Sequence, residues 1–231
     1  MKRFVLLLAA ALLAAQAGAP EVEITAEPHH HLVLENKSVR VFNVEVDPGA
    51  ETHMHWHRHD YVYVTLGDTE IVNIVKDKAP ATVKLQDGET RFSPATFAHI
   101  VRNPMNRPFR NITIEILDDD SLRGAASPWD PKQNEDRGLN ILQGGTQQIL
   151  FVKDAIRVSE FELQPGGIFP MARSGGCLLV AVNDFDLRGD GTNHKAKADH
   201  LKSGDSKWFS GKRTLTNAGS TSAKFVTLEF P

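Results

Sequence analysis

The chain of 231 residues contains an internal repeat, so that its second half resembles its first. Self-similarity over a long period indicates duplicated structural units. Because single domains cluster near about 100 to 150 residues, the length allows two domains of this kind. We therefore expect two domains of one architecture. The corresponding segments are 36–41 (NKSVRV) with 153–158 (KDAIRV), 46–49 (VDPG) with 163–166 (LQPG), and 111–115 (NITIE) with 224–229 (KFVTLE).

Both halves consist of short runs in which apolar and polar residues alternate. Such runs, separated by Pro, Gly, Asp and Asn, are typical of strands joined by turns. The clearest runs span residues 39–46, 61–66, 71–75, 81–85 and 111–117. Many short antiparallel strands resolve their edges by closing into a barrel or a sandwich. The sequence therefore predicts an all-β protein with two β-barrel (jelly-roll) domains in tandem.

The first 17 residues have the layout of a secretory signal. Lys2 and Arg3 precede an apolar run over residues 4–15, and small residues follow. The run is shorter than the roughly 20 apolar residues that a membrane-spanning helix needs. We expect cleavage before Gly18 and an exported protein, periplasmic or secreted, without a membrane anchor. Cys177 is the single cysteine and cannot form an intrachain disulfide, so stability must come from packing, or partly from a bound metal.

A polar stretch over residues 118–138 (DDDSLRGAASPWDPKQNEDRG) divides the rest of the chain nearly in half and indicates a linker. The 26 basic and 29 acidic residues leave a net charge of -3, without a basic block that could follow a phosphate backbone. Nucleic acid is therefore not an expected partner. The predicted segments are a signal over 1–17, a first domain over 30–118, a linker over 119–137 and a second domain over 138–231.

Four histidines stand at alternate positions of one segment: His53, His55, His57 and His59. In an extended strand, residues two apart point to the same side, so several imidazoles converge on one face. Neutral imidazole is the commonest protein ligand of transition metals. The segment therefore indicates a metal site, with a solvated histidine-rich loop as the alternative.

Two segments of the first half resemble the two motifs of the cupins. Residues 88–103 (GETRFSPATFAHIVRN) fit the second motif, with His99 at the histidine position and Thr96 where a turn glycine is usual. Gly49, five residues and His55-x-His57 match the front of the first motif. Asp60, six residues and Gly67 match its back, although the spacer between the two parts is two residues instead of three or four. Dropping two residues keeps the strand parity, so we expect Asp60 to face inward.

The resemblance implies a small β-barrel for each repeat, a two-domain cupin or bicupin, and a divalent metal (Fe, Mn, Ni, Co or Zn) held by His55, His57, Asp60 and His99. A pair of His53 and His55 is an alternative, since four residues then separate it from Asp60. His59 is an alternative to Asp60. If His53 or His59 is not a ligand, it is a candidate catalytic base for a bound phenol or enol.

The second repeat lacks this ligand set. Arg213 stands at the position of His99, and a permanently cationic side chain repels a divalent metal. We therefore expect a degenerate, metal-free domain that packs against the first or forms a homodimer surface, with an anion site at Arg213 as the alternative. The positions of His53, His55, His57 and Asp60 become Pro170, Ala172, Ser174 and Cys177.

A metal with these ligands keeps open positions for an oxygen-rich small molecule. The resemblance implies a metal-dependent enzyme of the dioxygenase type. A sugar isomerase or epimerase and a non-catalytic binding protein of the envelope are the alternatives, because cupins host many chemistries. Two further features carry lesser expectations: the tract His29-His30-His31 is interpreted as surface, and Cys177 as buried and inert.

Overall fold

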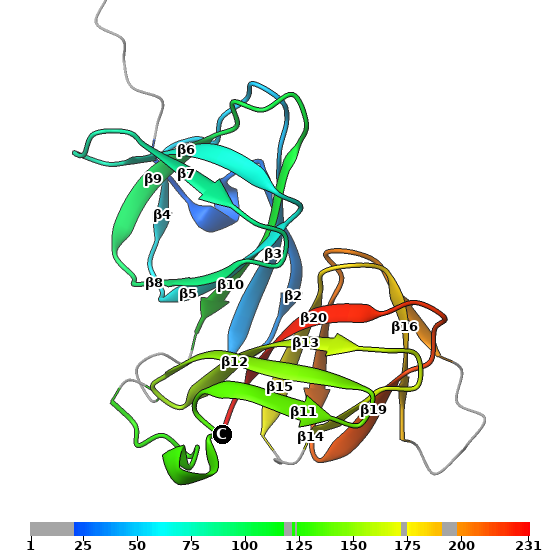
Figure 1. Cartoon of the computed structure of the whole chain (residues 1–231). Coiled ribbons are helices and arrows are strands. Elements are labelled where there is room, and N and C mark those ends of the chain that lie inside the picture. Colours follow the sequence, from blue (N-terminus) through cyan, green and yellow to red (C-terminus); the bar gives the residue numbers. More distant parts are fainter. Residues whose placement is uncertain (1–20, 118–121, 123, 172–174, 191–197) are drawn as a thin grey trace, which may run out of the picture.

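The computed structural model describes residues 21–117, 122, 124–171, 175–190 and 198–231, so the predicted signal segment and most of the start of the linker lie outside it. Within this part the chain is all-β, with two short 3-10 helices, η1 (Ile24–Ala26) and η2 (Pro131–Gln133). Each half forms a pair of sheets, which confirms the predicted fold class (Figure 1). No helix in the described ranges is long and apolar enough to cross a membrane.

The first half contains two five-stranded sheets, ordered β1-β4-β9-β6-β7 and β2-β3-β10-β5-β8. The predicted runs 39–46, 61–66 and 81–85 are β3, β5 and β7, with the same bounds. The strands are β1 (Val22–Glu23), β2 (His30–Glu35), β3 (Val39–Val46), β4 (His55–His57), β5 (Tyr61–Leu66), β6 (Thr69–Val75), β7 (Ala81–Leu85), β8 (Thr90–Ser93), β9 (Phe97–Arg102) and β10 (Phe109–Ile116).

The second half repeats this plan with sheets ordered β11-β12-β13-β20-β15-β18 and β14-β19-β16-β17. The strands are β11 (Gly138–Leu142), β12 (Gly145–Lys153), β13 (Ile156–Leu163), β14 (Ile168–Met171), β15 (Gly176–Ala181), β16 (Phe185–Gly189), β17 (Asp199–Leu201), β18 (Ser206–Ser210), β19 (Arg213–Asn217) and β20 (Ala223–Glu229).

One buried asparagine in each half shows that the repeat is structural as well as sequential. Asn103 and Asn217 are both fully buried. The Nδ2 of Asn103 donates to the carbonyl of Val46 at 2.9 Å, and the Nδ2 of Asn217 donates to the carbonyl of Leu163 at 2.9 Å. Because Val46 and Leu163 are themselves equivalent in the repeat, the same hydrogen bond ties the end of the second motif to the end of an inner strand in both halves.

The two halves share a hydrophobic core between the sheet that contains β3 and β10 and the sheet that contains β13 and β20. Aliphatic side chains from both halves meet in it, and each such side chain contributes about 1.5–3 kcal/mol when it is fully buried. The fully buried members include Val41, Val64, Ile112, Ile114, Val158, Leu178, Val226 and Leu228. Figure 1 shows the two strand layers lying side by side where the halves meet.

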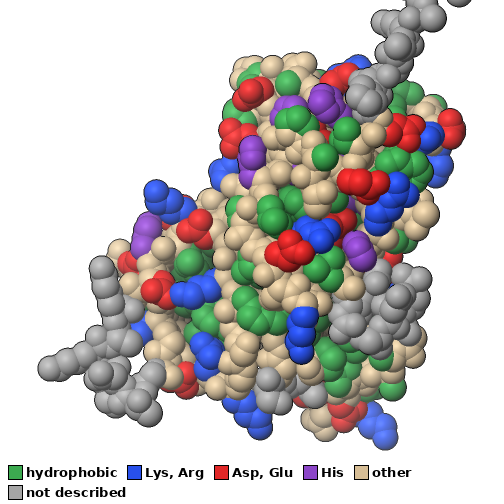
Figure 2. All heavy atoms as spheres, turned by 180° about the vertical axis from the view of Figure 1, so that it is seen from behind, with side chains coloured by type: hydrophobic (Ala, Val, Ile, Leu, Met, Phe, Trp, Pro, Cys, Tyr) green, Lys and Arg blue, Asp and Glu red, His purple; other side chains and the backbone are tan. Residues whose placement is uncertain are grey.

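Reciprocal polar contacts flank this shared core. In one, Arg110 of β10 donates to the carbonyl of Ser203 at 3.0 Å. In the other, Lys224 of β20 donates to the carbonyl of Asp87 at 3.3 Å. Since β10 and β20 are equivalent strands, each half donates a hydrogen bond from an equivalent basic side chain to a turn of the other half. Contacts of this reciprocal kind are typical of the subunits of a two-fold dimer. Elsewhere the surface carries interspersed acidic and basic side chains, as Figure 2 shows for one face.

Candidate metal centre

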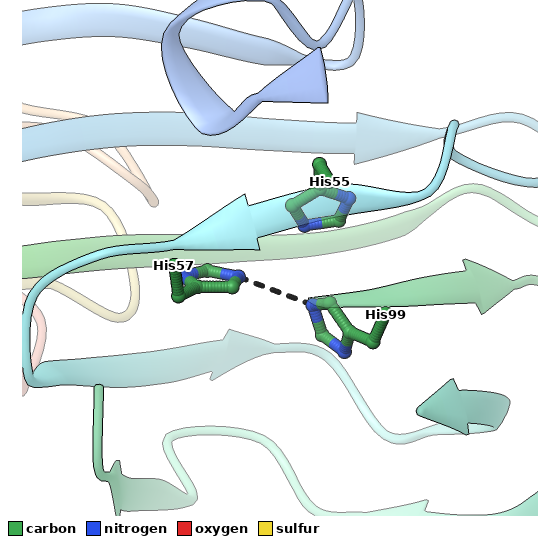
Figure 3. A group of neighbouring side chains, drawn as sticks. All are labelled: His55, His57 and His99. Atoms are coloured by element: carbon green, nitrogen blue, oxygen red, sulfur yellow. Dashed lines mark hydrogen bonds between the residues drawn. The ribbon is translucent and has the colours of Figure 1, made fainter. Parts of the chain in front are cut away.

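Two paired strands of the first half direct three histidines into the barrel. In the antiparallel pair of β4 and β9, His55 lies directly opposite His99. His57 stands two residues further along β4 and therefore shares the inward face. All three side chains are buried, and one ligand atom from each lies within 4.8 Å of the others. Figure 3 shows the three rings gathered around one point, with His57 and His99 facing each other.

Hydrogen bonds to the outer ring nitrogens leave the inner ones available. The Nδ1 of His55 lies 2.9 Å from the carbonyl oxygen of His53, and the Nδ1 of His99 lies 2.8 Å from the Oδ1 of Asn73. Both partners are acceptors, so both Nδ1 atoms carry the proton and both Nε2 atoms carry lone pairs. The Nε2 of His55 is buried without a hydrogen-bond partner, and the Nε2 of His57 lies 3.1 Å from that of His99. Orphaned, oriented imidazole nitrogens of this kind fit a metal ion.

Burial also keeps the three rings neutral. Desolvation, reinforced by the neighbouring His30, lowers the pKa of His55 to about 4. Desolvation and the neighbouring imidazoles hold the pKa values of His57 and His99 well below the ordinary range. Metal ions bind the deprotonated ring, so protons do not compete for these nitrogens near neutral pH.

Two residues of the triad, His57 and His99, line a cavity of about 150 Å³ inside the barrel. A cavity of this size holds a molecule as small as one aromatic ring. The cavity wall contains both polar and apolar side chains. His57 and His99 form one part of it, aliphatic and aromatic side chains form much of the rest, and Arg91 is the basic residue among them. The polar residues of the wall also include His30, Thr52, Tyr63, Asn73, Asn111 and Thr113.

The structure corrects the prediction that the tract 29–31 is all surface. The side chain of His30 is 4% exposed and lines the cavity, and its ring centroid lies 4.6 Å from that of His55. Its Nδ1 lies 2.6 Å from Glu27, whose carboxylate is fully buried. The prediction was wrong for His30 because β2 pairs along β3 and thereby carries this residue to the interior. His31, on the other side of the strand, is exposed.

Asp60, His53 and His59 do not join the group of three. The Oδ1 of Asp60 accepts a hydrogen bond from the backbone of Ala95 at 2.7 Å, so the carboxylate braces the turn in which Thr96 has a positive φ of 72°. His53 is exposed and acts through its backbone, while His59 is half-buried and interacts with the charge of Glu115. The roles of Asp60 as a ligand and of His53 and His59 as catalytic bases stay predictions.

Large aromatic side chains occupy the interior of the second barrel. In the first barrel Val44 and Asn111 pair across β3 and β10 and line the cavity. The equivalent pair in β13 and β20 is Phe161 and Phe225, whose ring centroids are 5.0 Å apart. Phe169 joins them at 4.3 Å from Phe161. These rings fill the volume that is a cavity in the first barrel.

The second-barrel residues at the ligand positions have other contacts. The Nη2 of Arg213 donates to the carbonyl of Ser210 at 2.6 Å, and its guanidinium lies over the ring of Phe209. Cys177 is 1% exposed, and burial raises the pKa of its thiol well above the ordinary value, which agrees with an inert thiol. Pro170 is exposed, whereas Ala172 and Ser174 lie outside the described residues.

Comparison with known proteins agrees with this architecture. No protein-family model matches the chain. A variant of salicylate 1,2-dioxygenase from Pseudoaminobacter salicylatoxidans superposes with a TM-score of 0.59 at 11% identity, over 84% of this chain and 70% of that one. A variant of oxalate decarboxylase OxdC from Bacillus subtilis gives 0.57 at 12%, over 87% and 75%. AerE from Microcystis aeruginosa gives 0.56 at 12%, over 89% and 98%.

A likeness in sequence points the same way. The chain is 29% identical to oxalate decarboxylase OxdC of Bacillus subtilis (strain 168) over 87 residues, which are 37% of this chain and 22% of that protein. The fold and the site together define a two-domain β-barrel protein with a buried histidine triad that could hold a metal ion. The chain has the two-barrel fold of these proteins, and its histidine triad lies in the N-terminal half, as the resemblance of the two motifs to the cupins predicted.

Proposed function

We propose that this chain is an exported, metal-dependent cupin enzyme that acts on a small oxygen-rich organic substrate in the manner of a dioxygenase. The observation that carries the proposal is the triad itself: three buried, neutral imidazoles whose inner nitrogens converge beside a cavity. Imidazole nitrogens suit divalent transition metals such as Fe, Ni and Zn. Such an ion, when bound, supplies Lewis acidity and, if it is redox-active, an electron path to dioxygen.

The residues of the cavity define which substrates fit. The volume of about 150 Å³ admits one small ring or a short dicarboxylic acid. Asn73 and Asn111 offer amide groups that orient oxygen atoms of a substrate, while Arg91 on the wall is already paired with Glu89 at 2.6 Å. Tyr61, buried against the His57 ring, keeps water away from that side of the triad. Small phenolic, enolic and carboxylic acids are therefore the substrates to screen.

Metal analysis tests the proposal directly. The full chain, purified without a histidine tag, is expected to hold about one equivalent of Fe, Mn, Ni or Co. His99→Ala removes one of the three ligands and should abolish tight binding, whereas the equivalent substitution in the second barrel, Arg213→Ala, should leave the metal content unchanged. A wild-type metal content in the His99→Ala protein would refute the site. Oxygen uptake with the candidate acids then separates a dioxygenase from an isomerase, which works without oxygen, and from a binding protein, which forms no product.

A further inference from the structure

Glu27, which lies before both cupin motifs, is a buried carboxylate with an unusual set of partners. Its side chain is completely buried and accepts four hydrogen bonds. The donors are the backbone and Nδ1 of His29 at 2.8 and 3.0 Å, the Nδ1 of His30 at 2.6 Å, and the backbone of His53 at 3.1 Å. Burial by itself would raise the pKa of Glu27, yet the bonds from His30 and His29 hold it well below the ordinary value. The group is therefore a fixed negative charge.

Two chains of contacts lead from this carboxylate to His55. Along the first, Glu27 holds the amide of His53, and the carbonyl of His53 orients the Nδ1 of His55 at 2.9 Å. Along the second, Glu27 holds the ring of His30, which lies 4.6 Å from the ring of His55. Both chains of contacts end at His55, whose Nε2 is buried and has no hydrogen-bond partner.

The backbone of the same segment also follows the ligand strand. Val22 and Glu23 of β1 pair in parallel with His55 and Trp56 of β4. The chain from β1 through η1 to Glu27 therefore lies along the strand that carries two of the three triad histidines. A buried charge costs free energy unless its hydrogen bonds are satisfied, and a fully satisfied network makes its surroundings rigid.

We propose that Glu27 is a positioning residue of the metal centre, which fixes the direction of the His55 ring through the His53 peptide and through His30. The inference rests on the metal site proposed above. The segment before the first motif would then take part in metal binding. The hydrogen bond from His30 to Glu27 also holds the His30 ring in the cavity wall, where a bound ligand would contact it. Residues that orient metal ligands typically change metal affinity by about 10- to 100-fold when they are replaced.

The test is the affinity and the spectrum of bound Co²⁺ in the full chain. Glu27→Gln keeps the size of the side chain, but each of the two carboxylate oxygens accepts from a backbone N–H, that of His29 or of His53, so the new amide NH₂ faces a donor in either orientation and cannot replace the lost acceptor. We expect Co²⁺ to bind about 10- to 100-fold more weakly, with a shifted absorption spectrum in the visible range. Glu23→Gln is the matched control: it makes the same change in a half-exposed carboxylate of β1 that pairs with Arg58, and it should bind and absorb like the wild type.

The outcomes separate this inference from the function on which it rests. If the wild-type chain binds no Co²⁺, the proposed metal site fails. If the wild type binds and Glu27→Gln binds equally with an unchanged spectrum, Glu27 is not a positioning residue. If Glu23→Gln loses affinity as strongly, the loss of a negative charge anywhere in this segment explains the effect, and the inference is overturned. If Glu27→Gln does not fold, Glu27→Asp retains the charge on a shorter chain and should fold with an intermediate affinity and a shifted spectrum; an unchanged spectrum would again refute the role.

Discussion

The buried histidines of the first barrel predict that the metal-free protein loses stability as the pH falls below about 6.5. An unfolded histidine takes up a proton near its ordinary pKa of 6.5, whereas burial lowers the pKa of folded His55 to about 4. Between these values the unfolded chain binds the extra proton, so acidification favours unfolding. The penalty is absent above pH 6.5 and is complete below pH 4.

The magnitude follows from the difference between the two pKa values. A gap of roughly 2.5 pKa units corresponds to about 3 kcal/mol for His55 alone, since one unit is about 1.4 kcal/mol. At pH 5.5, one unit below the ordinary value, about 1 kcal/mol of this has been lost. His30, His57 and His99 have lowered pKa values as well and add in the same direction. Glu27 acts at lower pH, because its stabilising charge is lost only as the pH falls below 4.5.

Denaturant unfolding of the metal-stripped protein between pH 7.5 and 5.5 measures this loss. The free energy of unfolding should fall by at least about 1 kcal/mol over this range, while the m-value stays constant. His55→Gln should make the dependence on pH shallower by one histidine. His31→Gln, which changes an exposed neighbour of the site, should leave it unchanged. A free energy of unfolding that is constant from pH 7.5 to 5.5 would refute the argument that these rings are buried in the neutral form.

Two further predictions concern the fold. Asn103→Ala and Asn217→Ala should each destabilise the protein by about 2–4 kcal/mol in denaturant, because each leaves buried backbone groups unpaired; equal and negligible effects would contradict the hydrogen bonds described. Leu228→Ala in the shared core should cost about 2–5 kcal/mol and shift a single unfolding transition. Two separate transitions, of which only the second moves, would show that the halves unfold independently.

The triad could be located from the sequence by strand parity together with the resemblance to the two cupin motifs, because parity alone also admits His53 and His59. His55 and His57 are two residues apart on one strand, and the second motif places His99 on the strand beside it. The same parity argument does not determine the direction of Asp60. β4 ends at His57 and β5 begins at Tyr61, so Asp60 lies in the connection, where side chains do not alternate and a nearby backbone amide is an attractive partner.

Glu27 and His30 escaped prediction because their contacts join segments that the sequence does not relate. No motif covers residues 21–30, and three consecutive histidines look alike whatever their burial. Only the pairing of β1 with β4 and of β2 with β3 brings Glu27 to His53 and His30 to His55. The sole local signal was a carboxylate three residues before a histidine, which is too common to indicate a buried pair.

The repeat predicted two domains, but the contents of the second barrel depend on register. Arg213 stands at the position of His99, and this replacement alone predicts that the second barrel has no metal site. That the space is filled follows from other positions, where Val44 and Asn111 give way to Phe161 and Phe225. The repeat places Phe161 at the position of Val44, but only the pairing of the strands shows that Phe225 lies opposite Phe161 as Asn111 lies opposite Val44.

The reciprocal contacts between the halves resemble those of a symmetric dimer, but the two halves can accumulate different substitutions. In a dimer of identical chains every substitution occurs twice, so a phenylalanine that fills one barrel also closes the other. Here the peptide chain joins the two halves, and a substitution occurs once. The aromatic rings around Phe161 can therefore make one barrel a solid support, while its twin keeps the histidines and an open interior. Because the two halves belong to one chain, their sequences can differ, and one barrel can be filled with side chains while the other retains its cavity.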